Sequence, residues 1–219
     1  MHTLSEENYL KAIYYLGHND TKKISPTAIA EALNNNPASV IDMLKKLSDK
    51  KLIQYEKSKG VKLTDRGKKT AVSIVRNHRL WEVFLLEKLG YTWDEVHSIA
   101  EQLEHVHHPD LANRLDKFLS FPQYDPHGDP IPKSNGQMPE LPTTLLDGVG
   151  EGKFCRVVAV KDTSASFLQY LEKLNIGIGA HIKVLDKIDY DSSVVIAVGK
   201  NKATVSEKFT KNIVVDSIK

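Results

Sequence analysis

Several features are scarce or missing in this 219-residue sequence, and each limits what the protein can be. There is a single cysteine, Cys155, so an internal disulfide framework is excluded and a reducing compartment is indicated. No run approaches about 18 uncharged apolar residues, which predicts that no helix spans a membrane. The N-terminal segment carries acidic residues where a secretory signal would be basic and then apolar. We therefore expect a cytoplasmic protein without a membrane partner.

Charge is unevenly distributed along the chain, although the whole sequence has a formal net charge of only +2. Residues 1–70 carry a net charge of +5, residues 71–150 carry −6 and residues 151–219 carry +3. Six of the nine histidines lie in the acidic middle segment. A basic head favours a polyanionic partner, and an acidic, histidine-rich segment favours a metal cation. An ordinary solvated surface is the alternative explanation of the charge pattern taken alone.

The hydrophobic periodicity predicts a mainly α-helical chain that ends in a small β domain. Apolar positions recur at helical spacing in six segments, which are residues 4–17, 26–33, 37–49, 65–89, 92–106 and 109–119. A segment rich in Pro, Gly and Asp, residues 121–142, predicts a linker or an extended connection. After Gly152 the pattern changes to five short β-type runs and one helical segment, which predicts a small β-barrel.

The first 70 residues have the pattern of a winged helix-turn-helix, because two short helices with a tight break are followed by a basic hairpin. The recognition helix would span residues 37–49. Lysine and arginine in the hairpin would neutralise phosphates. The alternative is a helical unit that merely packs and is solvated by its lysines. We predict that double-stranded DNA is bound by Ser25, Thr27, Asn36, Pro37, Ala38, Ser39, Asp42, Lys46, Lys57 and Lys59.

The middle segment contains two helical patterns of possible metal ligands. His78 and Glu82 are four residues apart on one expected helix. The next expected helix carries four such residues on one side, which are His97, Glu101, Glu104 and His105. Clustered carboxylates repel one another unless a cation lies between them, and a divalent metal is the simplest candidate. A surface face with pH-dependent ion pairs is the alternative.

With these motifs the chain resembles the diphtheria toxin repressor family of iron- and manganese-dependent regulators. The resemblance extends over essentially the whole sequence. It is carried by the winged helix, by the motif H-R-L-x-E at 78–82, by E-x-x-E-H at 101–105 and by DPHGDPIP at 125–132. It implies three domains, a winged helix-turn-helix (1–70), a helical metal-binding and dimerisation domain (71–140) and an SH3-like domain (150–219).

The resemblance also implies two metal sites, whose residues carry over by position. An ancillary site would use His78, Glu82 and His97, with Asp162 as the nearest side chain from the SH3-like domain. A primary site would use Glu101, Glu104, His105 and Asn8 from the first helix. Lys11 stands where some manganese sensors have a glutamate, which argues against their two-metal arrangement.

The resemblance further implies a homodimeric repressor in which metal binding activates operator binding and no organic cofactor takes part. Manganese-responding members typically have glutamate at the position of Glu101, whereas iron-responding members typically have cysteine. Carboxylate oxygen is a hard ligand, so we expect Mn²⁺, with Fe²⁺ able to substitute. Two alternatives stay open at this point. One is a regulator that senses an organic ligand, with a structural His/Glu face, and the other is a metallohydrolase.

Overall fold

The structure is a computed structural model that describes residues 2–17, 24–56, 59–140 and 144–217. The chain forms two compact units. Unit 1 comprises Met1–His78, Glu101–Arg114 and Pro132–Gln137, and unit 2 comprises Arg79–Ala100, Leu115–Ile131 and Met138–Lys219. Among the described residues, no helix is long and apolar enough to cross a membrane.

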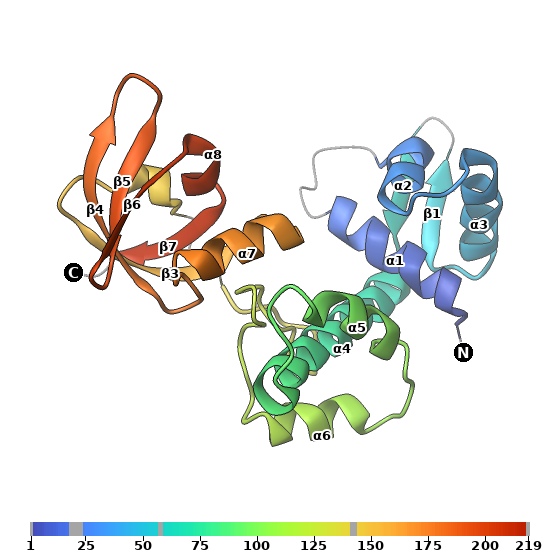
Figure 1. Ribbon diagram of the computed structural model, residues 1–219. Helices are drawn as coiled ribbons and strands as arrows, with labels where there is room; N and C mark the ends of the chain where they lie inside the picture. The colour runs from blue at the N-terminus through green and yellow to red at the C-terminus, as the bar shows by residue number, and fades with distance from the viewer. Residues whose placement is uncertain (1, 18–23, 57–58, 141–143, 218–219) are drawn as a thin grey trace. The chain divides into compact units, whose positions relative to one another are not determined.

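Unit 1 begins with three helices and a hairpin that lie together (Figure 1), which are α1 (Leu4–Leu16), α2 (Pro26–Ala32), α3 (Pro37–Asp49), β1 (Ile53–Glu56) and β2 (Gly60–Leu63). The side chain of Ser25 accepts a hydrogen bond from the backbone N–H of Ala28, so it caps α2. The side chain of Asn36 caps α3 in the same way through the N–H of Ala38. Both helices therefore begin at the cap-and-proline signals that the sequence contains.

The apolar stripes of these helices share one core. Its fully buried members include Leu10, Ile13, Ile29, Val40, Leu44 and Leu47. The hairpin is antiparallel, with Ile53 opposite Leu63 and Glu56 opposite Gly60. Gly60 has a φ of 81°, a conformation that glycine adopts without steric cost. The structure thus has the predicted winged helix-turn-helix.

Three further helices follow the hairpin, α4 (Asp65–Leu89), α5 (Val96–Leu103) and α6 (Leu111–Phe118). The expected helix over 92–106 is shorter in the structure. Before it, the backbone N–H of Thr92 donates to the carboxylate of Glu95 and holds a turn. After it, the side-chain amide of Asn77 donates to the backbone carbonyl of Glu104, beyond the last helical residue. The prediction that His97, Glu101, Glu104 and His105 share one helical face is therefore wrong, because the last two follow the end of α5.

The C-terminal part, within unit 2, is an antiparallel five-stranded sheet with strand order β6-β5-β4-β3-β7. The strands are β3 (Phe154–Val160), β4 (His181–Ile188), β5 (Ser193–Val198), β6 (Asn201–Val205) and β7 (Ile213–Ser217). Three short helices accompany them (Figure 1), which are η1 (Leu146–Gly148), α7 (Ala165–Lys173) and α8 (Glu207–Thr210). This sheet is the predicted β domain, and it fits the expected SH3-like architecture.

The loop DPHGDPIP is fixed against β3. Gly128 has a φ of 85°, and a Cβ atom built on it would lie 2.1 Å from the backbone oxygen of Val158. The backbone carbonyl of His127 also accepts a hydrogen bond from the N–H of Val160. Only glycine allows so close an approach of the two backbones. The loop therefore presents Asp125 and His127 in a defined position.

Candidate metal centres and DNA-binding surface

One cluster of possible ligands is built on α4 and α5. His78 and Glu82 lie one turn apart on α4, and both are buried. His97 on α5 is exposed, and its Nδ1 atom is 3.0 Å from Glu82 Oε1. Each of the three side chains offers a ligand atom, and these atoms lie within 4.8 Å of one another. The structure therefore brings together the three residues that sequence analysis assigned to the ancillary site.

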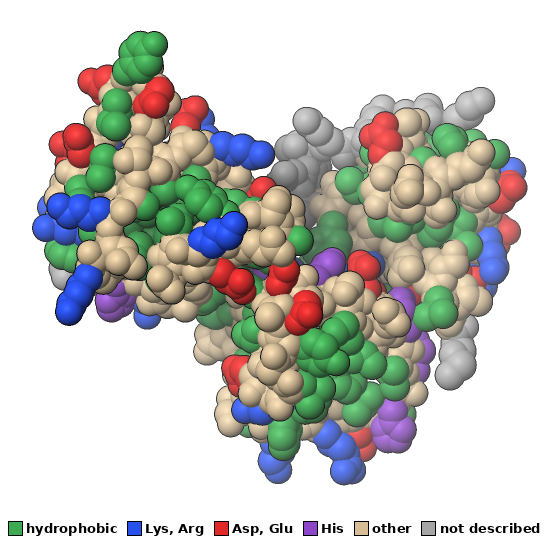
Figure 2. All heavy atoms as spheres, viewed as in Figure 1, with side chains coloured by type: hydrophobic (Ala, Val, Ile, Leu, Met, Phe, Trp, Pro, Cys, Tyr) green, Lys and Arg blue, Asp and Glu red, His purple; other side chains and the backbone are tan. Residues whose placement is uncertain are grey.

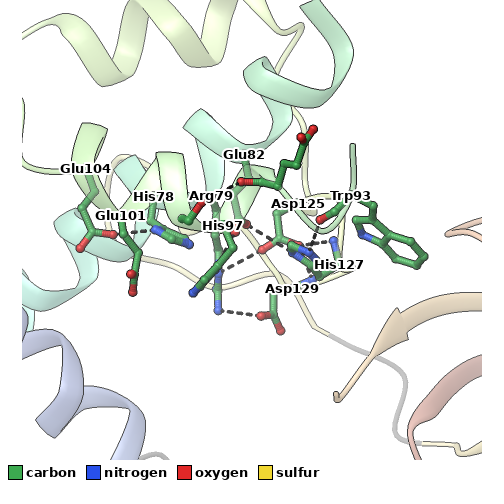
Figure 3. Close-up of polar contacts among 12 residues, drawn as sticks. His78, Arg79, Glu82, Trp93, His97, Glu101, Glu104, Asp125, His127 and Asp129 are labelled. Atoms are coloured by element: carbon green, nitrogen blue, oxygen red, sulfur yellow. Dashed lines mark hydrogen bonds and ion pairs between the residues drawn. The ribbon is translucent and has the colours of Figure 1, made fainter. Parts of the chain in front are cut away.

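Glu82 also belongs to a buried group that includes two residues of the DPHGDPIP loop (Figure 3). Ligand atoms of Glu82, Asp125 and His127 lie within 4.8 Å of one another. The Nδ1 atom of His127 is 3.5 Å from Glu82 Oε2, and its ring stacks on that of Trp93 at a centroid distance of 6.0 Å. An oxygen-rich, buried group with one imidazole is a suitable ligand set for a divalent cation.

The electrostatics of this group reflect two carboxylates that share a buried space. Burial, followed by the negative charges of Glu82 and Asp129, raises the pKa of Asp125 to about 7. The Nε atom of Arg79, 3.5 Å from Asp125 Oδ2, partly opposes this effect. Although burial disfavours the charged imidazole, the hydrogen bond and charge of Glu82 raise the pKa of His127. Glu82 and Asp125 thus favour the positively charged form of His127, and Asp125 also lies beside the guanidinium of Arg79.

Sequence analysis missed Asp125 and His127 as possible ligands, although it recognised their loop as a family motif. The signal was the pairing of an acid and a histidine two residues apart within a Pro/Gly-rich turn. Asp162 has a different setting. Its carboxylate accepts the backbone N–H of Ser164 just before α7, and the side chain and then the backbone of Ser164 lower the pKa of Asp162. Among the described residues, Asp162 does not join either group of possible ligands.

A second cluster, within unit 1, is centred on Glu104, whose side chain is completely buried. Its Oε2 atom is 2.6 Å from His78 Nδ1 and 2.8 Å from Lys11 Nζ, and its Oε1 atom is 2.7 Å from Lys11 Nζ. Although burial disfavours the carboxylate form, the hydrogen bond from His78 and the charge of Lys11 lower the pKa of Glu104. Glu101 lies at the edge of the cluster, about half exposed, with Oε1 3.7 Å from Lys11 Nζ.

The first helix places in this cluster a residue that the sequence did not single out. Asn8 is exposed, whereas its neighbour Glu7 is buried. The two carboxylate oxygens of Glu7 lie 2.6 Å from His105 Nδ1 and 2.6 Å from His107 Nε2. His107, which sequence analysis did not include, therefore joins the cluster. In this structure Glu7, like Lys11, joins α1 to the segment after α5.

Glu6 connects the same helix to the recognition helix. Its buried carboxylate oxygen Oε1 lies 2.9 Å from Nζ of Lys46 on α3 and 2.7 Å from Nζ of Lys50, the residue that caps the end of α3. Although burial opposes ionisation, these lysines and the N–H of Thr3 lower the pKa of Glu6 to about 2. Neighbouring residues on α1 thus contact the Glu104 cluster on one side and α3 on the other.

The predicted DNA-binding residues are exposed on α2, α3 and the hairpin, with two qualifications. Lys46 is half exposed and paired with Glu6, and Lys57 lies outside the described residues. Figure 2 shows that basic and acidic side chains both lie over α3, where Lys45 pairs with Asp42 at 3.3 Å. In the hairpin, Lys59 pairs with Glu56 at 2.8 Å. The exposed predicted residues are Ser25, Thr27, Asn36, Pro37, Ala38, Ser39, Asp42, Lys46 and Lys59.

Three family models match the chain. They are the iron dependent repressor N-terminal DNA binding domain at residues 1–61, the iron dependent repressor metal binding and dimerisation domain at 64–133, and the FeoA domain at 144–217. Together they span nearly all of the sequence.

Curated relatives and solved structures agree with these models. The iron-dependent repressor IdeR of Mycobacterium tuberculosis is 34% identical over 128 residues, 58% of this chain and 54% of that protein. The chain therefore spans about half the length of that relative. The transcriptional regulator MntR of Oceanobacillus iheyensis is 39% identical over 122 residues, 55% of this chain and 81% of that protein. A solved manganese-dependent transcriptional repressor in complex with manganese is 32% identical, with a TM-score of 0.83 over 97% of this chain and 100% of that chain.

Proposed function

The chain belongs to the iron-dependent repressor family, and from this premise we propose that it is a transcriptional repressor whose binding to operator DNA requires a divalent metal ion. It acts as a homodimer in the cytoplasm, and it is a DNA-binding protein rather than an enzyme. Its three domains span residues 1–70, 71–140 and 150–219. The winged helix-turn-helix and the names of the related proteins support this proposal.

One observation carries the metal dependence. The Oε1 atom of Glu104 is buried and makes no hydrogen bond to a described residue, although two basic side chains lie beside the carboxylate. Lys11 Nζ already lies 2.7 Å from this oxygen, and a buried carboxylate requires such a cation beside it, a place that a divalent ion can also fill. The residues present thus fit a divalent ion. Glu101, Glu104 and His105 would hold it, with Asn8 as the predicted fourth ligand, and the ion would supply positive charge that joins these side chains.

A second ion would be held by the buried group around Glu82. Glu82, Asp125 and His127 offer two carboxylates and one imidazole, and His78 and His97 complete the polar surroundings. The loop is held on β3 through Gly128, so this site is preorganised. Asp162 remains the predicted additional ligand from the SH3-like domain.

The contacts of α1 support a route from metal to DNA. Glu7 joins α1 to His105 and His107, and Glu6 joins α1 to Lys46 on α3 and to Lys50 at its C-terminal cap. An ion bound beside His105 would fix the position of α1 and, through Glu6, that of the recognition helix. Metal and operator would then share a coupling free energy, so each would strengthen the binding of the other.

Manganese is the metal that this ligand set favours. Glu101, Glu104 and Asn8 offer oxygen, and His105 offers nitrogen, without a thiolate that would retain Zn²⁺. Mn²⁺ binds more weakly than Fe²⁺ to most ligand sets, so Fe²⁺ should substitute in the test tube. We therefore propose control of manganese and iron homeostasis, with Mn²⁺ as the effector.

A gel-shift assay with the protein's own promoter tests the proposed function. EDTA should abolish the specific shift, and added Mn²⁺ or Fe²⁺ should restore it. Binding that is sequence-specific, of full affinity and insensitive to EDTA would overturn the proposal and favour a regulator of the organic-ligand class. In the same assay Glu207→Gln, which removes a negative charge from an exposed ion pair with Lys211 in the C-terminal domain, should bind the operator as wild type does.

A further inference from the structure

Lys11 lies against the same carboxylates that the proposed function assigns to the primary metal. It stands on α1, and its side chain is only 13% exposed. Its Nζ atom is 2.7 Å from Glu104 Oε1, 2.8 Å from Glu104 Oε2 and 3.7 Å from Glu101 Oε1. The ammonium group therefore contacts both oxygens of Glu104 and also approaches Glu101.

The burial of Glu104 explains why this contact matters. A completely buried carboxylate is strongly destabilising without a cation, and removing one partner of such a pair leaves the other uncompensated. In the metal-free protein, the ammonium of Lys11 supplies that cation together with the hydrogen bond from His78. A divalent ion bound to Glu104 would do the same with greater charge.

The ammonium and the ion cannot both occupy this position. Oε1 of Glu104 already has Nζ at 2.7 Å, which is the space that a bound ion requires. Two cations that share one carboxylate also repel each other strongly where solvent is excluded. Lysine has a long, rotatable stem, so its ammonium can move away once the ion neutralises the carboxylates.

We infer that Lys11 is a tethered competitor of the metal ion, which neutralises Glu104 and Glu101 in the metal-free protein and is displaced when a divalent ion binds. This inference rests on the proposed function and deepens it. Lys11 lowers the affinity for metal and so raises the metal concentration at which the repressor switches. A lysine that only held α1 in place would stabilise the metal-free and metal-bound forms equally.

The experiment compares wild type with Lys11→Met, and uses Lys211→Met as a control that removes the same charge from an exposed pair. Each metal-free protein is titrated with Mn²⁺ against a fluorescent chelator, and thermal unfolding is followed with and without saturating Mn²⁺. Lys11→Met should bind Mn²⁺ at least about tenfold more tightly. Its Tm should fall in the metal-free form and recover with Mn²⁺, whereas Lys211→Met should bind Mn²⁺ like wild type.

The opposite results are equally clear. An unchanged Mn²⁺ affinity in Lys11→Met, or a loss of Tm that is the same with and without Mn²⁺, would overturn the inference while leaving the proposed function intact. If wild type itself binds no Mn²⁺, the proposed function fails as well. Lys11→Arg keeps the charge and should bind Mn²⁺ no more tightly than wild type. If metal-free Lys11→Met does not fold, the same titration on Lys11→Gln decides between the two outcomes.

Discussion

The two clusters of possible ligands differ in the cation that lies beside their carboxylates. The group of Glu82, Asp125 and His127 is buried throughout, and its neighbouring cation Arg79 is anchored by the backbone carbonyl of Pro130. The Glu104 cluster instead uses the ammonium of Lys11, while Glu101 remains about half exposed. The first arrangement suits an ion that holds a loop in place. The second suits an ion that binds and dissociates, because the ammonium of Lys11 can take its place.

The largest expected effect comes from removing the central acid of the Glu104 cluster. Glu104→Gln should weaken Mn²⁺-activated operator binding by more than about 100-fold, because even the outer partners of metal ligands contribute about 10–100-fold. The measurement is operator binding by fluorescence anisotropy at limiting Mn²⁺. Glu207→Gln should retain wild-type activation. Wild-type activation in Glu104→Gln would remove Glu104 from the metal site.

The next effect concerns the contact between α1 and α3. Glu6→Gln should lower the free energy of unfolding of the N-terminal domain by about 2 kcal/mol, because hydrogen bonds from Lys46 and Lys50 to a charged group are lost. Urea unfolding measures this change, with the exposed Glu31→Gln as the control.

The lowered pKa of Glu6 predicts how the difference in stability between wild type and Glu6→Gln changes with pH. Its folded-state pKa is lowered from 4.5 to about 2. The stabilisation that it provides is therefore fully present above pH 4.5 and is lost as the pH falls towards 2. Wild type and Glu6→Gln should consequently converge in stability in acid. A difference that stays constant over this range would mean that Glu6 does not act through its charge.

A smaller effect on DNA binding is expected from the buried group. Glu82→Gln should reduce the number of Mn²⁺ ions bound per chain, while operator affinity at saturating Mn²⁺ falls by less than about tenfold. Equilibrium dialysis gives the stoichiometry, and anisotropy gives the affinity. If Glu82→Gln loses operator binding as fully as Glu104→Gln, the distinction between the two clusters is wrong.

The smallest effect is expected in the hairpin, which belongs to neither cluster. Lys59→Ala should weaken binding to every DNA sequence by a similar factor and reduce the slope of log affinity against log salt by about 1. Lys59 is exposed and pairs with Glu56 at 2.8 Å. A salt slope identical to that of wild type would mean that Lys59 does not contact the phosphate backbone.

Local sequence signals predicted the fold well because they act over a few residues. Ser25-Pro26 and Asn36-Pro37 begin helices where they were expected to, and the short β-type runs after Gly152 marked the strands of the C-terminal sheet. The helix predicted over 92–106 was longer than the observed one, because hydrogen bonds of polar side chains set the ends of the helix. The amide of Asn77, for example, reaches Glu104 from a helix more than two dozen residues earlier.

The candidate sites were predictable where spacing alone decides them. His78 and Glu82 are one helical turn apart, whereas their grouping with His97 was implied by the family resemblance. The pairing of Lys11 with Glu104 joins residues 93 positions apart, and that of Glu7 with His105 joins residues 98 apart. No periodicity contains such information. Which residues of α1 lie against Glu104 and His105 depends on the rotation of α1, which only tertiary packing fixes.

A metal ion at the Glu104 cluster and operator DNA should share a coupling free energy. The most direct test of this coupling is the affinity of the wild-type protein for Mn²⁺, measured with and without a saturating operator fragment. Operator DNA should tighten Mn²⁺ binding by the same factor by which Mn²⁺ tightens operator binding. A Mn²⁺ affinity that is identical with and without operator DNA would contradict it.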